Sequence, residues 1–259
     1  MCEIFALNSE KRIEINSYLK KFFEHSLVHC HGWGLSCHTN GGLMFHKEAL
    51  SAQKSAYLKG RLRFPVVESN VLAHIRYATV GRISPENAHP FILKDICGTD
   101  YSFIHNGTLH LSAKLDKYVF NQKGSTDSER FSMMMIDELN RACLKNGGKP
   151  DAVDRFVLFE RLIAEFAPGN KLNLLFSDGE YTYVHTNVEN GLYVLEKDDA
   201  VFFSTLPLTK EAWKNVPCTK LLAYKNGSLA IEGREHDNIY LLSEEEQMFV
   251  DRSREILVS

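Results

Sequence analysis

The chain has 259 residues, 44% of them apolar and 24% charged, which is the composition of a globular protein large enough to bury a substantial core. A formal charge of -3 without a dense Lys/Arg cluster argues against nucleic-acid binding and against an anionic membrane surface. No apolar run reaches the roughly 18 residues of a membrane helix, and the N-terminus lacks the basic segment of a signal peptide. We therefore expect a cytoplasmic protein that acts on a small molecule.

The sequence also favours one undivided unit. It contains no linker-like, low-complexity or repeated tract, so a single domain over residues 1–259 is expected. The cysteines show no CxxC spacing and are interpreted as free thiols: Cys2, Cys30, Cys37, Cys97, Cys143 and Cys218.

The first half of the chain is predicted to hold strands around one helix. Residues 2–7 alternate as a strand, and apolar residues at helical spacing follow over 15–25. A hairpin is predicted over 32–45, since Asn40-Gly41 is typical of a tight turn. Residues 71–76 and 101–105 are typical of buried strands.

The second half is predicted to begin with two neighbouring helices, over 126–143 and 153–166. A capping box at Ser243–Glu246 predicts a last short helix. Between them lie short predicted strands, over 172–177, 181–186, 192–195, 201–204, 221–224 and 229–231. The pattern predicts an α+β fold in which helices cover packed antiparallel sheets.

Cys2 is the first candidate for chemistry. Met1 before a small residue is commonly removed, which would give Cys2 a free α-amine beside its thiol. The amine has a reference pKa of roughly 7.7 to 8.0, so it can take the thiol proton near neutral pH without a separate histidine. The alternative is that Cys2 is a buried small hydrophobe.

Three further segments contain polar residues after predicted strands. Arg76 and Thr79 could bind a carboxylate, although Arg76 could equally be structural. Asn106 and Gly107 could form an oxyanion hole, although Asn-Gly is first of all a hairpin turn. Asp127 could hold an ammonium group, although Thr126 and Glu129 also fit a helix capping box.

The ordered set of motifs resembles the class II glutamine amidotransferase domain of the N-terminal nucleophile hydrolases. The motifs are Cys2, H-x-R-Y-A-T-x-G from His74, N-x-H-P from Asn87, H-N-G from His105 and T-D-S-E from Thr126. Residues 174–179 and 204–208 also resemble stand-alone bacterial members. The resemblance implies a four-layer αββα sandwich that needs neither cofactor nor metal.

The resemblance also implies a role for each site residue. Cys2 would be the nucleophile, and Asn106 and Gly107 would stabilise the oxyanion. Arg76 and Thr79 would bind the α-carboxylate of glutamine, and Asp127 its α-ammonium group.

Val80 departs from the sugar-phosphate aminotransferase branch, where histidine follows the threonine. From the length of 259 residues we also expect no ammonia-accepting synthase domain. Two hypotheses remain open for the substrate. The protein either releases ammonia from glutamine, for a separate partner subunit, or hydrolyses γ-glutamyl peptides or conjugates.

Two other classes of protein are weaker alternatives. A zinc-binding or regulatory protein could use His29, Cys30, His31, Cys37 and His38, but their spacing matches no common structural zinc site. An acylase for other amides would not explain Arg76 together with Asp127, since that pair suits an amino-acid zwitterion.

Overall fold

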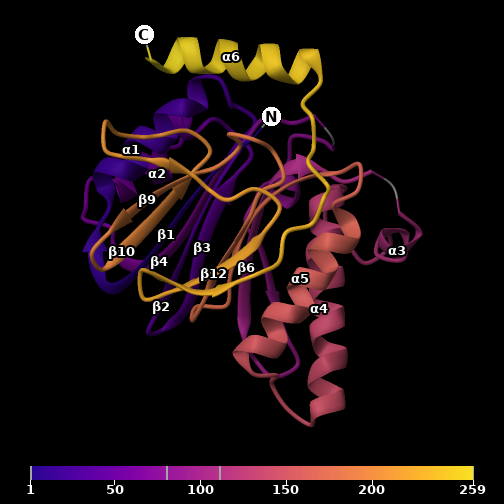
Figure 1. The fold of residues 1–259 in the computed structure, drawn as a ribbon. Helices are drawn as coiled ribbons and strands as arrows, with labels where there is room; N and C mark the ends of the chain where they lie inside the picture. The colour runs from indigo at the N-terminus through magenta and orange to yellow at the C-terminus, as the bar shows by residue number, and fades with distance from the viewer. Residues whose placement is uncertain (1, 80, 111, 259) are drawn as a thin grey trace.

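The computed structural model describes residues 2–79, 81–110 and 112–258. Met1 and Val80, on which two of the sequence arguments rest, lie outside these residues. The described chain forms two antiparallel sheets packed face to face, with α1 and α2 outside the first sheet and α4 and α5 outside the second (Figure 1). The expected αββα sandwich is confirmed.

The first sheet has seven strands in the order β11-β9-β10-β1-β4-β2-β3. Their bounds are β1 Glu3–Glu14, β2 Gly32–Thr39, β3 Gly42–Glu48, β4 Val67–Arg76, β9 Tyr193–Lys197, β10 Ala200–Ser204 and β11 Lys214–Asn215. The second sheet has six strands in the order β13-β12-β8-β7-β6-β5. Their bounds are β5 Phe91–Lys94, β6 Asp100–Thr108, β7 Lys171–Ser177, β8 Thr182–His185, β12 Leu221–Lys225 and β13 Ser228–Glu232.

Six α-helices and three 3-10 turns complete the described part of the chain. The α-helices are α1 Asn16–Glu24, α2 Ala56–Arg61, α3 Ala113–Asp116, α4 Asp127–Asn146, α5 Ala152–Phe166 and α6 Glu244–Val258. The 3-10 turns are η1 His25–Leu27, η2 Ala52–Lys54 and η3 Pro85–Asn87.

Strand alternation divides the core into layers. In β1, Ile4 and Ala6 point toward the second sheet and meet Ile104 of β6, whereas Phe5 and Leu7 point toward α1. Side chains two residues apart in a strand share a face. Cys2, two residues before Ile4, therefore also faces the space between the sheets.

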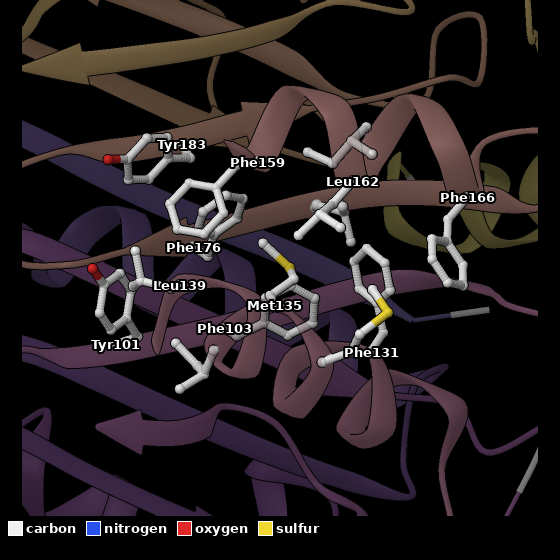
Figure 2. Close-up of a cluster of buried hydrophobic side chains, with 14 of the residues drawn as sticks. Tyr101, Phe103, Phe131, Met135, Leu139, Phe159, Leu162, Phe166, Phe176 and Tyr183 are labelled. Carbon is white, nitrogen blue, oxygen red and sulfur yellow. The ribbon is translucent and has the colours of Figure 1, made fainter. Parts of the chain in front are cut away.

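The outer face of the second sheet packs against α4 and α5 through a cluster of aromatic and aliphatic side chains (Figure 2). Phe103 of β6 lies 6.1 Å from Phe131 of α4, between ring centroids, and Phe159 of α5 lies 5.1 Å from Phe176 of β7. Large buried rings dominate the apolar area of a core, so this cluster fixes both helices on the sheet.

Several boundaries differ from the sequence expectations. The first strand continues to Glu14, because its charged second half pairs with β4 beyond an irregularity between Asn8 and Ile13. The last helix is longer than expected at 15 residues, although its capping box at Ser243 and Glu246 is confirmed. The strand β5 and the helices α2 and α3 were not predicted, because segments this short give little periodic signal.

The start of β1 is fixed by a buried carboxylate on its outer face. Glu3 Oε2 lies 2.7 Å from His25 Nδ1, and Glu3 Oε1 lies 2.9 Å from His29 Nε2. Burial alone would raise the pKa of Glu3, but the charges and hydrogen bonds of His25 and His29 lower it to about 2. Residue 3 is thereby tied to η1 and to the segment that precedes β2.

We predict that Glu3→Gln destabilises the protein by about 3 kcal/mol at pH 7, because it removes one partner from a buried ionic cluster. The carboxyl pKa is lowered on folding, so the stabilisation is present above pH 4.5 and is lost as the pH falls toward 2. Urea unfolding at pH 7 and at pH 3 checks both statements. Glu10→Gln, at an exposed position of the same strand, is the control, and an equal loss in the two variants would contradict the prediction.

Candidate functional site

Cys2 is half-buried at the end of the space between the two sheets that α6 covers. Its thiol donates a hydrogen bond to the carbonyl oxygen of Tyr77, at 3.6 Å, just beyond the end of β4. Burial raises the pKa of the Cys2 thiol, while that hydrogen bond and the positive charges of Arg76 and Lys171 oppose the shift. A raised thiol pKa means that attack on a substrate requires a nearby base.

Asn106 faces Cys2 from the second sheet. It lies on the same face of β6 as the inter-sheet residue Ile104, and it lines one pocket together with Cys2 and Thr205. The two segments that the sequence marked separately, Cys2 and H-N-G, are thus brought together by the packing of the sheets.

Gly107 lies inside β6, so the interpretation of Asn106-Gly107 as a hairpin turn is wrong. A Cβ atom at Gly107 would lie 1.9 Å from the carbonyl oxygen of Lys171 and 2.3 Å from His105 Nε2. Glycine is needed here because β6 and β7 approach too closely for a side chain.

Arg76 ends β4 beside Cys2. Its guanidinium group is largely buried and donates a hydrogen bond from Nη1 to the carbonyl oxygen of Arg82, at 3.0 Å. The register of β1 and β4 pairs Glu3 with Ile75, so the adjacent residues Cys2 and Arg76 are neighbours. Burial lowers the pKa of Arg76, while the negative charge of a Cys2 thiolate opposes that shift. Thr79, the other expected carboxylate ligand, lies exposed in the loop that follows.

Asn87 joins this loop to the start of α4. Its Nδ2 donates to the carbonyl oxygen of Arg82, at 3.0 Å, and its Oδ1 accepts from the backbone N–H of Ser125, at 2.7 Å. Because Arg76 bonds the same carbonyl, the N-x-H-P motif positions Arg76 relative to the T-D-S-E motif.

Asp127 lies in the first turn of α4, as expected. Its Oδ2 accepts a hydrogen bond from the backbone N–H of Leu109, at 2.6 Å, just after β6. Thr126 caps the helix by accepting from the backbone N–H of Glu129, whereas the Glu129 carboxylate accepts from the backbone of Lys123 and Gly124. The Thr126 half of the predicted capping box is therefore confirmed and the Glu129 half is not. The Asp127 carboxylate instead contacts the residue that follows β6.

His105 connects three parts of the site from the outer face of β6. Its Nδ1 lies 2.9 Å from Ser128 Oγ, and its Nε2 lies 2.9 Å from the carbonyl oxygen of Lys171. Burial lowers the pKa of His105, although the charge of Asp127 opposes the shift. A neutral ring that donates from Nε2 and accepts at Nδ1 satisfies both contacts and holds β6, β7 and α4 in register.

Helix α6 covers Cys2, a contact that no sequence pattern indicated. Figure 1 shows α6, in yellow, lying across one end of the sandwich. Phe249 and Ser253 of this helix line the Cys2 pocket, and the Phe249 ring lies 4.8 Å from that of Tyr77 and 5.8 Å from that of His29. A capping box marks where a helix begins but gives no signal of where it docks.

The cysteine and histidine cluster does not assemble into a metal site. Within residues 2–79, 81–110 and 112–258, no group of three or more His, Cys, Asp or Glu side chains could hold a metal ion. His29 is bound to Glu3, His31 Nδ1 accepts from the backbone N–H of Ala78, and Cys30 is exposed while Cys37 is buried. Across the same described ranges, no helix is long and apolar enough to span a membrane.

Solved structures with the same architecture include two amidotransferases. A "predicted glutamine amidotransferase" from Pseudomonas aeruginosa is 20% identical, with a TM-score of 0.63 over 89% of this chain and 100% of that one. The glutamine phosphoribosylpyrophosphate amidotransferase of Bacillus subtilis is 19% identical, with a TM-score of 0.66 over 92% of this chain and 50% of that one. At these identities the likeness shows the fold.

Sequence relatives point the same way. A "Putative glutamine amidotransferase" from Haemophilus influenzae is 27% identical over 90% of this chain and 87% of its own length. The protein YafJ of Escherichia coli, named in the same words, is 30% identical over 62% of each chain. The family model for class II glutamine amidotransferases matches residues 1–199. Since that match covers well over half of the sequence, this chain belongs to the class II glutamine amidotransferases.

Proposed function

We propose that the chain hydrolyses the side-chain amide of glutamine or of a related γ-glutamyl compound, with Cys2 as the nucleophile after removal of Met1. The observation that supports this most is that Cys2 and Asn106, on facing strands of the two sheets, line one pocket. Residues 1–259 would act as one amidotransferase domain.

The proposed reaction uses the two functional groups of Cys2. The α-amine takes the thiol proton, and the sulfur attacks the substrate carbonyl carbon. Asn106 Nδ2–H and the backbone N–H of Gly107 donate to the resulting oxyanion. The C–N bond then breaks, the leaving nitrogen receives the proton from the α-ammonium group, and water hydrolyses the thioester to release glutamate.

The ends of the amino acid would be held by the other predicted residues. Arg76 and Thr79 would bind the α-carboxylate, and Asp127 the α-ammonium group. The buried position of Arg76 beside Cys2 and the placement of Asp127 at the end of β6 support these roles. Ammonia released from glutamine would pass to a separate acceptor protein.

The first test is glutamate release from glutamine by protein whose Cys2 N-terminus has been verified by mass spectrometry. We expect Cys2→Ala to lower the rate by about 10⁴-fold or more, because no other group can form the thioester. Cys30→Ala removes an exposed thiol elsewhere and should retain the rate. Full activity in Cys2→Ala, or in protein that retains Met1, would refute the role of Cys2.

A second test addresses the ammonium site. Asp127→Asn keeps an oxygen that can accept from the backbone N–H of Leu109 but removes the charge, so KM for glutamine should rise about tenfold or more with a smaller change in kcat. Steady-state kinetics measure both constants. Asp137→Asn, on the same helix, should retain the parent KM, and an unchanged KM in Asp127→Asn would show that another group binds the amine.

A further inference from the structure

A second hollow opens directly beyond the nucleophile. Its charged lining residues are Lys171, Arg254 and Glu189, and we call it the leaving-side groove. It is continuous with the Cys2 pocket, because the two share four lining residues: Asn106, Thr205, Leu206 and Val250.

The strand order shows which part of a substrate would enter this groove. In the first sheet β1 lies between β4, which ends in Arg76, and β10, which leads into Thr205. A γ-glutamyl group bound at Arg76 and attacked by Cys2 extends from the β4 side toward β1. The atoms beyond the scissile bond therefore point to the β10 side, where the leaving-side groove lies.

The groove contains a buried cation. Lys171 pairs with Thr108 across β6 and β7, which places its side chain on the same face as Asn106. That side chain is only 3% exposed, and its Nζ lies 3.3 Å from Glu246 Oε1 of α6. Burial lowers the pKa of Lys171, while the charge and hydrogen bond of Glu246 oppose that shift, so a carboxylate at this position stabilises the ammonium form.

The carboxylate that pairs with Lys171 belongs to Glu246, in the first turn of α6. Glu246 also accepts from Tyr240 Oη, at 3.2 Å, and from the backbone N–H of Ser243, at 3.0 Å. Both of these partners precede or open α6, so Glu246 would keep hydrogen bonds if it left Lys171. An external carboxylate can therefore replace it at Lys171 without leaving Glu246 unpaired.

We propose, building on the proposed function, that the leaving-side groove binds a leaving group that carries a carboxylate, and that Lys171 binds this carboxylate in place of Glu246. The substrate class is then a γ-glutamyl amino acid or peptide. Hydrolysis consumes one water and yields glutamate and the free amino acid, whose nitrogen takes the proton that the thiol lost. The ammonia that leaves glutamine has no carboxylate, so Lys171 would not contribute to its binding.

The test compares γ-glutamylglycine with γ-glutamylglycinamide, which differ only in the carboxylate of the leaving group. We expect the parent protein to prefer γ-glutamylglycine in kcat/KM by about tenfold or more, as one charge-assisted contact allows. In Lys171→Met this preference should disappear. Lys214→Met, at an exposed position of β11, is the matched control and should retain the parent preference.

Glu246→Gln separates substrate binding from a structural role. If Lys171 only anchors α6, Lys171→Met and Glu246→Gln break the same ion pair and should change the preference alike. If Lys171 binds the leaving group, Glu246→Gln removes a competing carboxylate and should raise the preference for γ-glutamylglycine. Parallel changes in the two variants, or a parent protein without any preference, would overturn the proposal.

Calorimetry with the Cys2→Ala variant measures the binding of γ-glutamylglycine and of its amide without hydrolysis. It therefore tests the role of Lys171 separately from the proposed reaction. Tighter binding of γ-glutamylglycine than of its amide, lost on adding Lys171→Met, would support the groove even if the parent protein hydrolysed neither compound. Hydrolysis of glutamine without any Lys171-dependent binding would retain the proposed function and overturn the groove.

Discussion

The site depends on the alternation of side chains along its strands, which point in turn into and out of the space between the sheets. Cys2 and Asn106, which face each other between the sheets, each have a neighbour in the chain that is anchored by polar contacts on the opposite face. Cys2 faces inward while its neighbour Glu3 is bound to His25 and His29, and Asn106 faces inward while its neighbour His105 is bound to α4 and β7. Adjacent residues of a strand point to opposite faces, so these anchors fix the direction of the inward residues. Glu3 and His29 also line the Cys2 pocket, so the first anchor forms part of its wall.

The close approach of β6 and β7 links Asn106 and Gly107, the proposed oxyanion donors, to the leaving-side groove. The carbonyl oxygen of Lys171 accepts from His105, and the absence of a side chain at Gly107 lets that carbonyl come near. The same residue directs its side chain to the groove beside Asn106. A shift of β7 would therefore move both the strand that holds the proposed oxyanion donors and the buried side chain of Lys171.

Local sequence patterns predicted the strands and helices that hold the candidate site residues better than they predicted the contacts between these elements. Alternation around Cys2 and the long apolar periodicity of α4 and α5 are local signals, and both describe the structure well. The inclusion of Gly107 in a strand depends on the approach of β7, which no local pattern reveals. Lysine is rarely buried, so Lys171 at the start of a strand gave no reason to expect a cation in the core of the site.

The docking of α6 was beyond prediction for the same physical reason, since its contacts are long-range and few. Phe249 covers Tyr77 and His29 through ring contacts, while Glu246 contributes the ion pair with Lys171. Under the proposal above, these two contacts would respond differently to a ligand. A carboxylate that bound Lys171 would replace the ion pair but leave the ring contacts in place, so α6 would loosen only at its N-terminal end. Substrate binding and the opening of the groove would then be one equilibrium, driven by the difference in affinity of Lys171 for the two carboxylates.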